Sequence, residues 1–529
     1  MRNVSSPYRQ LRIRRRTISS AWMLLRSGDL TGFSRRLWMR LVRLWRILSG
    51  KNSTINYGEW RNQWVDLTEQ DRDFVTGWVS ATQFAVVLAH GPPDAMEATL
   101  ASLGTQLHQK WTVETECDDA AWIVELEAGV VLHPAALATT ARVIDADPNL
   151  RLVYADFDHL ESNGIPFDPC FLPDWNPDLF DGLHRIGPLV VRHRSISISL
   201  QGSRSSLRGS EVAHLPYVLA SRPGHLRSGD PAPTRKHWPV GNPPPRVSVL
   251  IPTKDQGRLL KRCLTSLRNV TTYPNMEVVL IDHESTEPLA RSVIDGLSND
   301  ATTLVTSFSG PFNFAEMCNQ AAKVATGDVL VLLNNDTEVL AADWLDEFVG
   351  QLARPEVGVV GALLLFTDGT IQHAGVHPGV NGLMGHGHKH RPGNDPGYHG
   401  RLTVAHEVAA VTGACLGITK QLWDRLGGLD NEKFAVAYND IDLCLRVREI
   451  GLRVIMTPHA VLHHHESASR GYDDDPIRRA RLQGEVDRMR ERWGDRLNED
   501  PAYNPNLSLT ESGFTTADPP RAAPPWRNM

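Results

Sequence analysis

The stretch Val329-Leu-Val-Leu-Leu333, followed at once by Asn334-Asn335-Asp336, decides the fold class that this 529-residue sequence predicts. Five β-favouring apolar residues in a row are typical of a strand buried on both faces of a sheet. In an open α/β sheet, ligands bind in the crevice beyond the carboxyl ends of such strands. Two amides and a carboxylate at that position indicate a site for a diphosphate held through a metal ion. The alternative is a simple turn after a core strand, since Asn and Asp also favour turns.

Strands and helices alternate around this stretch. Apolar runs predict strands, leucines recurring on one face predict helices, and Asn313-Phe-Ala-Glu316 has the spacing of a capping box at a helix start. This alternation predicts an α/β fold with a mostly parallel sheet and helices on both faces. The predicted strands are 246–251, 277–281, 329–333 and 453–456, and the predicted helices are 258–269, 313–325 and 439–450.

The first half of the sequence repeats this plan. Phe84–Leu88 and Thr99–Leu103 parallel the first strand and helix of the second half. Trp122–Leu126 parallels Val329–Leu333, and the residues after it are Glu127-Ala128-Gly129. A glycine cannot bind a metal ion through a side chain. We therefore expect an internal duplication whose first copy has lost its chemistry.

The composition is that of a globular protein, with 41% apolar and 22% charged residues. The length allows two or three domains. The six cysteines form no CxxC pair, which argues against a zinc ribbon or a disulfide scaffold and suits a reducing cytosol. The sequence contains no signal-peptide pattern and no apolar run of about 18 residues, so we expect neither secretion nor a membrane span.

Positive charge is concentrated at the N-terminus. Residues 1–51 contain twelve arginines and Lys51 against the single acidic residue Asp29, a balance of +12 in a chain whose net charge is −6. Apolar residues recur there at helical spacing between arginines, flanked by Trp38 and Trp45. This pattern is typical of an amphipathic helix on an anionic membrane surface. The alternatives are a helix docked on the protein's own body, a mitochondrial presequence and a nucleic-acid-binding arm.

Acidic side chains at strand ends and helix starts are candidates for the chemistry. Asp282 and Asp336 follow predicted strands and Asp440 opens a predicted helix, so all three can face one crevice. Carboxylate oxygens bind Mg2+ and Mn2+ and leave positions for substrate phosphates, which makes Asp336 a candidate ligand. Leu462-His-His-His-Glu466 adds imidazoles, which Mn2+ accepts. In the alternative interpretation Asp440 caps its helix and the histidines form a surface loop.

Together these residues resemble family 2 glycosyltransferases with the GT-A fold. The resemblance runs from Arg246 to about Gly471, and six motifs occur in the order that the family has them. The first half resembles the diverged first domain of tandem bacterial proteins of this family, through Tyr154–Asp158 and Pro169–Asp178. The six motifs are 247–253, 280–285, 332–337, 411–415, 438–443 and 463–471.

The resemblance implies that a nucleotide-sugar binds at the strand ends, with Thr253 and Asp282 at its base and ribose. Gly413 and Ala414 would lie near the donor sugar and the acceptor. The positions that it assigns to nucleotide-sugar binding are Pro252, Thr253, Asp282, Asn319, Asn334, Asn335, Gly413 and Ala414.

The resemblance also implies a metal ion, Mn2+ or Mg2+, held by Asp336 and His464, with the other two histidines of the run as competitors. Asn334 stands where the family's DxD motif often has its first aspartate. Asp440 matches the second residue of the family's Glu-Asp pair, in which Asn439 replaces the glutamate. By this match Asp440 would deprotonate the acceptor hydroxyl.

The expected function is inverting, metal-dependent transfer of a sugar from a nucleotide-diphosphate sugar to a glycan or lipid-linked acceptor in bacterial surface polysaccharide synthesis. We expect the protein in the cytoplasm, attached peripherally to the inner face of the cell membrane, without a nucleic-acid partner. The main alternative is a non-catalytic membrane-surface scaffold or sugar-binding partner with vestigial domains. A dinucleotide-dependent Rossmann enzyme is disfavoured because no GxGxxG follows the first strand of either half.

Prolines and glycines divide the sequence into domains, since they sustain neither helix nor sheet. Prolines also recur in the tail from about Ala517, which predicts disorder there. The expected domains are a basic arm at 1–51, a degenerate GT-A-like domain at 80–222, a Pro-rich linker at 223–245, the catalytic domain at 246–500 and a partly disordered tail at 501–529.

Overall fold

The computed structural model describes residues 56–113, 120–196, 207–224, 232–297, 300–465, 476–510 and 513–527. The chain divides into two compact units, residues 1–60 and 61–529. The basic arm predicted at 1–51 lies outside the described residues. Within the described ranges, no helix is both long enough and apolar enough to cross a membrane.

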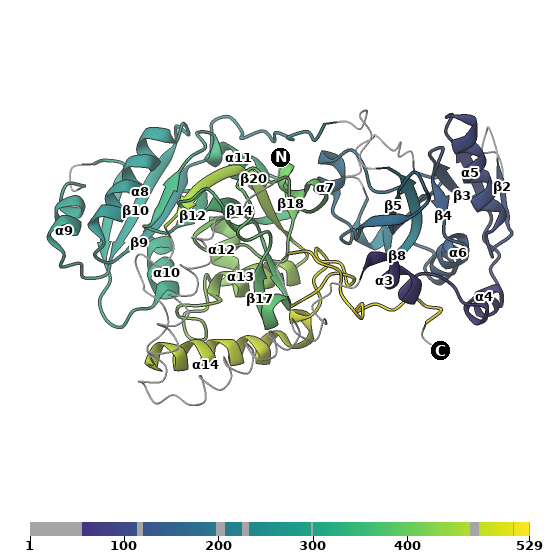
Figure 1. The fold of residues 1–529 in the computed structure, drawn as a ribbon. Helices are drawn as coiled ribbons and strands as arrows, with labels where there is room; N and C mark the ends of the chain where they lie inside the picture. The colour runs from purple at the N-terminus through teal and green to yellow at the C-terminus, as the bar shows by residue number, and fades with distance from the viewer. Residues whose placement is uncertain are drawn as a thin grey trace, which may run out of the picture. The chain divides into compact units, whose positions relative to one another are not determined.

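The first half contains one mixed sheet of eight strands (Figure 1). Its strands are β1 Phe84–Leu88, β2 Trp111–Val113, β3 Trp122–Leu126, β4 Val131–Leu132, β5 Leu152–Leu160, β6 Pro166–Cys170, β7 Val190–His193 and β8 Val212–Pro223. Its helices are α3 Tyr57–Trp64, α4 Glu69–Thr76, α5 Pro93–Gly104, α6 Ala136–Ala146, α7 Pro177–Gly182 and η1 Gly209–Glu211. The strand order is β2-β1-β3-β7-β5-β8-β4, with β6 paired to β5.

The second half contains a sheet of ten strands and a separate two-stranded pair. Its strands are β9 Val247–Thr253, β10 Met276–Asp282, β11 Thr303–Ser307, β12 Val329–Leu333, β13 Thr337–Val339, β14 Val357–Leu365, β15 Ile371–His373, β16 Val376–Pro378, β17 Met384–His386, β18 His406–Glu407, β19 Cys415–Thr419 and β20 Arg453–His464. Its helices are α8 Gly257–Val270, α9 Pro288–Asp295, α10 Phe314–Val324, η2 Val380–Gly382, η3 Tyr398–Thr403, α11 Trp344–Leu352, α12 Lys420–Leu426, α13 Asn439–Glu449, α14 Pro476–Trp493 and η4 Gly494–Leu497. The strand order is β11-β10-β9-β12-β19-β14-β20-β13, with β15 on β14 and β18 on β20.

Apart from β11 and β18 of the second sheet, the two large sheets share one order and one set of strand directions. In the first sheet β2, β1 and β3 are parallel, β7 is antiparallel to β3 and β5, β5 is parallel to β8, and β4 is antiparallel to β8. The series β10, β9, β12, β19, β14, β20 and β13 repeats these relations one by one. The hairpins β5–β6 and β14–β15 also correspond, since both are antiparallel.

Helices cover both faces of the second sheet because its strands are apolar on both sides. All residues of β9 and β12 are buried. Val249 and Val331 pack with Leu264 of α8 in one core cluster, whereas Leu250 and Leu330 pack with α10 in another. Figure 1 shows α8 and α10 on opposite sides of β9 and β10. The α/β fold predicted from the sequence is therefore confirmed.

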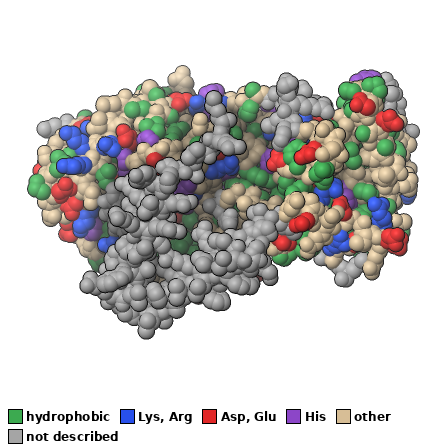
Figure 2. All heavy atoms as spheres, viewed as in Figure 1, with side chains coloured by type: hydrophobic (Ala, Val, Ile, Leu, Met, Phe, Trp, Pro, Cys, Tyr) green, Lys and Arg blue, Asp and Glu red, His purple; other side chains and the backbone are tan. Residues whose placement is uncertain are grey.

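Acidic and basic side chains intermingle over α8 and α9 on the face that Figure 2 shows.

Several predicted elements agree closely with the structure. β12 has the predicted bounds, and α10 begins as its capping pattern predicts, because the Asn313 side chain accepts from the Glu316 N–H at 2.9 Å. β20 is much longer than the predicted strand at 453–456 and continues to His464. Residues 232–246 form neither helix nor strand.

The disorder predicted for the tail is wrong for the residues that the structure describes there. Trp526 is completely buried and stacks on His133 at 5.3 Å. Arg527 pairs with Asp71 at 2.7 Å. The composition of the tail is Pro-rich, but one large aromatic ring buries enough apolar surface to hold the segment against the first half.

Candidate active site

The carboxyl ends of β9, β10 and β12 meet at one edge of the second sheet. Asp282 lies opposite Thr253 in the ladder between β10 and β9. Asn335, just beyond β12, donates from Nδ2 to Thr253 Oγ1 at 2.9 Å. The side chains predicted from separate strands therefore come together at the crevice that a parallel α/β sheet provides.

Asp336 and His464 face each other at this edge. β13 pairs antiparallel with β20 and sets Thr337 opposite His464, so the preceding Asp336 comes beside the imidazole. Asp336 Oδ1 lies 3.1 Å from His464 Nε2, and Asp336 is 3% exposed. Asn334 Nδ2 lies 3.3 Å from the same Nε2. Since β13 and β20 are far apart in the sequence, this contact depends on the pairing of the two strands.

Gln372 of β15 fixes the tautomer of His464. Its Oε1 accepts from His464 Nδ1 at 2.7 Å, so Nδ1 carries a proton and Nε2 is directed at Asp336. A lone pair and a carboxylate oxygen 3.1 Å apart repel each other unless a proton or a cation lies between them. A histidine whose outer nitrogen donates to an oxygen is the usual arrangement of an imidazole that binds metal.

The residues present thus fit a divalent cation with few protein ligands. No group of three or more His, Cys, Asp and Glu side chains that could hold a metal occurs among the described residues. Mg2+ and Mn2+ sites that take substrate phosphates need only one or two protein side chains. The neighbouring histidines face elsewhere: His463 Nδ1 lies 3.1 Å from the Phe366 carbonyl, and His465 Nε2 lies 3.4 Å from Glu338.

Asp440 lies in the first turn of α13 and accepts two backbone N–H groups. Its Oδ2 accepts from Gly413 at 2.7 Å and its Oδ1 from Ile441 at 2.8 Å. Burial raises the pKa of Asp440, and the backbone donors oppose that rise. The Ala414 carbonyl accepts from the Asn334 N–H at 3.0 Å, so the segment Gly413-Ala414 ties Asp440 to the end of β12.

His373, next to Gln372 on β15, holds the other side of this segment. Its Nε2 accepts from the Thr412 N–H at 3.4 Å, and its Nδ1 lies 2.9 Å from His386 Nδ1. Burial lowers the pKa of His373 well below its ordinary value, so the ring is neutral and can accept. The short strand β15 therefore orients both His464 and the segment that holds Asp440.

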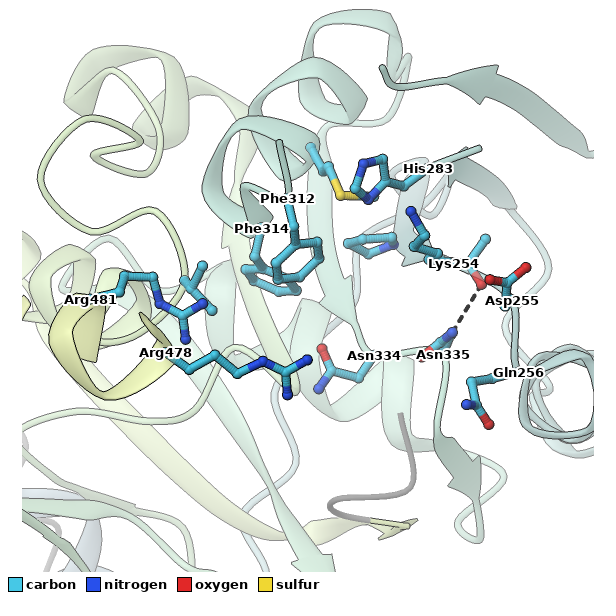
Figure 3. A pocket seen from close by; sticks show the side chains of 14 residues that line it. Lys254, Asp255, Gln256, His283, Phe312, Phe314, Asn334, Asn335, Arg478 and Arg481 are labelled. Carbon is cyan, nitrogen blue, oxygen red and sulfur yellow. Dashed lines mark hydrogen bonds between the residues drawn. The ribbon is translucent and has the colours of Figure 1, made fainter. Parts of the chain in front are cut away.

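A cavity of about 380 Å³ opens at the ends of β9 and β12 (Figure 3). Its basic lining residues are Lys254, Arg478 and Arg481, the last two three residues apart on α14. Figure 3 shows Arg478 extending toward Asn334. His283 and Phe312 stack at 5.9 Å with 24° between their planes and form a flat wall. The lining residues that the sequence predicted are Pro252, Thr253, Asn334 and Asn335.

The sequence reasoning missed the cationic and aromatic part of this cavity. The spacing of Arg478 and Arg481 could have indicated one helix face, but nothing local shows which crevice α14 covers.

Other residues that the sequence assigned to nucleotide-sugar binding form hydrogen bonds or ion pairs within the protein. Asp282 Oδ2 pairs with Arg291 Nη1 at 2.9 Å, and its Oδ1 accepts from the Ser285 N–H at 3.0 Å. The Asn319 amide is bonded at both ends to the backbone of Leu429, at 2.8 and 2.9 Å, and Asn319 does not line the cavity. Gly413 and Ala414 lie beside Asp440 and Asn334 instead.

The end of β3 in the first half, which corresponds to the end of β12, carries different residues. The third residue after β12 is Asp336, and the third residue after β3 is Gly129. Glu127 pairs there with Arg222 of β8 at 3.5 Å. β8 corresponds to β20. Arg222 of β8 thus lies beside Glu127, whereas His464 of β20 lies beside Asp336.

Comparison with known proteins relates part of this chain to a family. Residues 248–423 match the model of glycosyl transferase family 2. An uncharacterized protein of Sinorhizobium fredii, y4gI, is 35% identical over 452 residues, which are 75% of this chain and 50% of that protein. The O-antigen biosynthesis protein RfbC of Myxococcus xanthus is 35% identical over 434 residues, which are 73% of this chain and 34% of that protein. The chain spans half or less of the length of these two relatives.

Among solved structures, the mannosyltransferase PcManGT of Pyrobaculum calidifontis, in complex with GDP-Man and Mn2+, is similar at 23% identity and a TM-score of 0.35. The similarity covers 47% of this chain and 64% of that one. Residues 248–423, which lie in the second half, are thus the part of this chain that matches glycosyl transferase family 2.

Proposed function

We propose that the second half of this protein transfers a sugar from a nucleotide-diphosphate sugar to a hydroxyl group of a glycan or lipid-linked acceptor, with inversion at the anomeric carbon. One observation carries the proposal. Asp336 and His464 face each other at the end of β12, and Asp440 is tied to the same strand end through Gly413 and Ala414. Sugar transfer needs two such groups, one beside the leaving diphosphate and another beside the attacking hydroxyl.

Asp336 and His464 are the residues that would hold Mn2+ or Mg2+. When bound, the cation offsets the negative charge that develops on the leaving diphosphate. The imidazole favours Mn2+, since Mg2+ prefers oxygen ligands. Gln372 holds the His464 ring, and the Asp336 carboxylate lies buried beside it.

The cavity beside these residues would hold the rest of the donor. Arg478, Arg481 and Lys254 would bind phosphate oxygens, for which guanidinium groups supply paired N–H donors. The stacked rings of His283 and Phe312 offer a flat wall for a nucleobase. A volume of about 380 Å³ lies within the range of small-molecule sites.

Asp440 would accept the proton of the acceptor hydroxyl as its oxygen attacks the anomeric carbon. Its raised pKa makes the carboxylate a better proton acceptor than an exposed aspartate. The N–H groups of Gly413 and Ile441 hold both oxygens in place before the hydroxyl arrives. One direct displacement inverts the anomeric centre, so a product that retains the donor configuration would contradict this assignment.

We further propose that the transfer serves bacterial surface polysaccharide synthesis, in keeping with the O-antigen role in the name of the relative from Myxococcus xanthus. Residues 1–51, with a charge balance of +12, would attach the protein to the anionic inner face of the cell membrane. Vesicles with anionic lipid should bind the full chain, less so at high salt, and not a chain that begins at residue 52. Equal binding by both chains would refute the attachment.

A screen of nucleotide-diphosphate sugars tests the reaction. Each donor is added to the full chain with Mn2+ or with chelator, and the melting temperature is recorded, because a ligand of the native state stabilises it. We expect one class of donor to raise the melting temperature with Mn2+ and much less with chelator. The Asp336→Asn variant should lose the Mn2+ dependence, whereas an exposed control, Asp424→Asn, should keep it. If no donor stabilises the wild type, or if stabilised protein never releases nucleotide with glycan or lipid-linked acceptors, the scaffold alternative prevails.

A further inference from the structure

A second cavity, of about 130 Å³, lies between strands of the first half and η3 of the second half. It shares no lining residue with the donor cavity and has about a third of its volume. Apolar side chains of β5 and α7, among them Phe157 and Phe180, form much of its wall. Three guanidinium groups also line it, those of Arg185, Arg222 and Arg401. Its size suits one small charged group rather than a nucleotide.

Arg401 is a buried cation with little compensation from the protein. The residue is 4% exposed, and its Nη1 donates to the Ala502 carbonyl at 2.8 Å. That is its only hydrogen bond to the described residues, and none of their carboxylates lies within 4.0 Å of its guanidinium. The guanidinium carbon lies 5.5 Å from the ring of Tyr398 and 5.3 Å from the ring of Phe514. These rings attract the cation through their faces, but they supply no acceptor for the remaining N–H groups.

Two carboxylates in this part of the fold, those of Asp500 and Asp168, contact other groups, although Asp500 also attracts Arg401 from beyond hydrogen-bond distance. Asp500 accepts from His377 Nδ1 at 2.8 Å and from the Ala502 N–H at 2.9 Å. Asp168, the acidic residue that lines the cavity, lies 3.7 Å from His159 Nδ1. A charge removed from water requires a partner of opposite sign, and a guanidinium without one has a large desolvation cost. An anion in the cavity would supply the missing partner.

The cavity lies beside strands of the first half that correspond to the strands beside Asp336 in the second half. β6 and β8 of the first half correspond to β15 and β20 of the second half, by strand order and direction. Those two strands of the second half bring Gln372 and His464 together beside Asp336. The first half has Asp168 on β6 and Arg222 on β8 at the cavity wall instead. The copy without the metal ligands thus keeps a hollow between the same elements, lined by cations.

We propose that this cavity is an anion site, which binds the phosphate or carboxylate group of a small ligand through Arg401, with Arg222 and Arg185 at its wall. The guanidinium fork matches the paired oxygens of both groups. The apolar wall favours a ligand whose body is less polar than its anionic end. The proposal does not depend on the transfer reaction, because the two cavities have no residue in common.

Isothermal titration of the full chain with inorganic phosphate, glucuronate and uncharged glucose, at constant ionic strength, tests the proposal. We expect phosphate or glucuronate to bind and glucose not to bind. Binding of phosphate alone indicates a phosphorylated ligand, binding of glucuronate alone a carboxylate, and binding of both a general oxyanion site. Arg222→Gln, and Arg401→Lys if it folds, should each weaken binding by about tenfold or more, since one charge-assisted contact is altered in each. The exposed control Arg72→Gln should leave binding unchanged.

Phosphate could also enter the donor cavity, so the double variant Arg478→Gln/Arg481→Gln is titrated in parallel. Retained binding in this double variant locates the anion in the second cavity. The proposal is overturned if none of the anions binds the wild type. It is equally overturned if Arg222→Gln binds as tightly as the wild type, or if the double variant in the donor cavity abolishes binding.

Discussion

Replacing Gln372 by alanine should weaken metal binding without touching a metal ligand. The Gln372 Oε1 accepts from His464 Nδ1 at 2.7 Å, and the His464 side chain is 13% exposed. Without this acceptor the imidazole can rotate, and its Nδ1–H loses its partner in a nearly buried position. Loss of such an outer partner lowers metal affinity by roughly 10- to 100-fold, or about 1.4 to 2.8 kcal/mol.

The assay is a titration of the full chain with Mn2+ alone, by calorimetry and by the electron paramagnetic resonance signal of free Mn2+. Gln372→Glu should bind Mn2+ at least as well as the wild type, because a carboxylate accepts the same proton. Gln320→Ala, on α10, is the matched control, since its side chain pairs with Glu316. Turnover of Gln372→Ala should also recover at saturating Mn2+, which general damage to the fold would not allow. A Kd for Gln372→Ala within about twofold of the wild type would refute the reasoning, which expects a far larger change.

Three further changes test the base and the donor cavity. Asp440→Asn should lower kcat by roughly 10²- to 10⁴-fold and leave nucleotide binding nearly intact. In the wild type, burial raises the pKa of Asp440 above 3.8. The kcat of the wild type should therefore fall as the pH drops through that raised pKa, because the base must be ionised. Arg478→Gln/Arg481→Gln should weaken nucleoside diphosphate binding by about tenfold or more, measured by calorimetry, whereas the exposed control Arg425→Gln should not. Gly413→Ala introduces a methyl carbon 3.3 Å from Asp440 Cβ. The kcat should therefore fall by about tenfold with little change in nucleotide affinity. An unchanged kcat would contradict the positioning of Asp440 by the segment Gly413-Ala414.

Local sequence patterns predicted the elements of the second half but not their partners. Val329–Leu333 is a buried strand because five apolar residues need cover on both faces, and that requirement is visible in the sequence. The contact between Asn334 and His464 joins positions 130 residues apart, and that between Gln372 and His464 joins positions 92 apart. Such contacts depend on strand pairing and register, which periodicity within one strand does not encode.

The family resemblance assigned Asp336, His464 and Asp440 to one site, but it gave no information on what surrounds them. Gln372 could not be predicted, because a glutamine on a three-residue strand has no local signature of a metal site. Arg478 was missed for a similar reason: α14 is rich in arginine over its whole length, so its sequence does not single out the face that borders the cavity. Residues that support a site through a partner are the hardest to find from sequence.

The structure gives a physical reason why one substitution would not give the first half the metal site that we propose for the second half. Gly129, at the position that corresponds to Asp336, has a φ of +95°, and a Cβ there would lie 2.8 Å from Pro223 Cγ. An aspartate would therefore be strained in its backbone and would collide with the end of β8. Arg222 already lies 3.5 Å from Glu127 and supplies a fixed positive charge beside the remaining carboxylate. A guanidinium in that position repels an incoming divalent cation, so a metal site there would require changes on both β8 and the segment after β3.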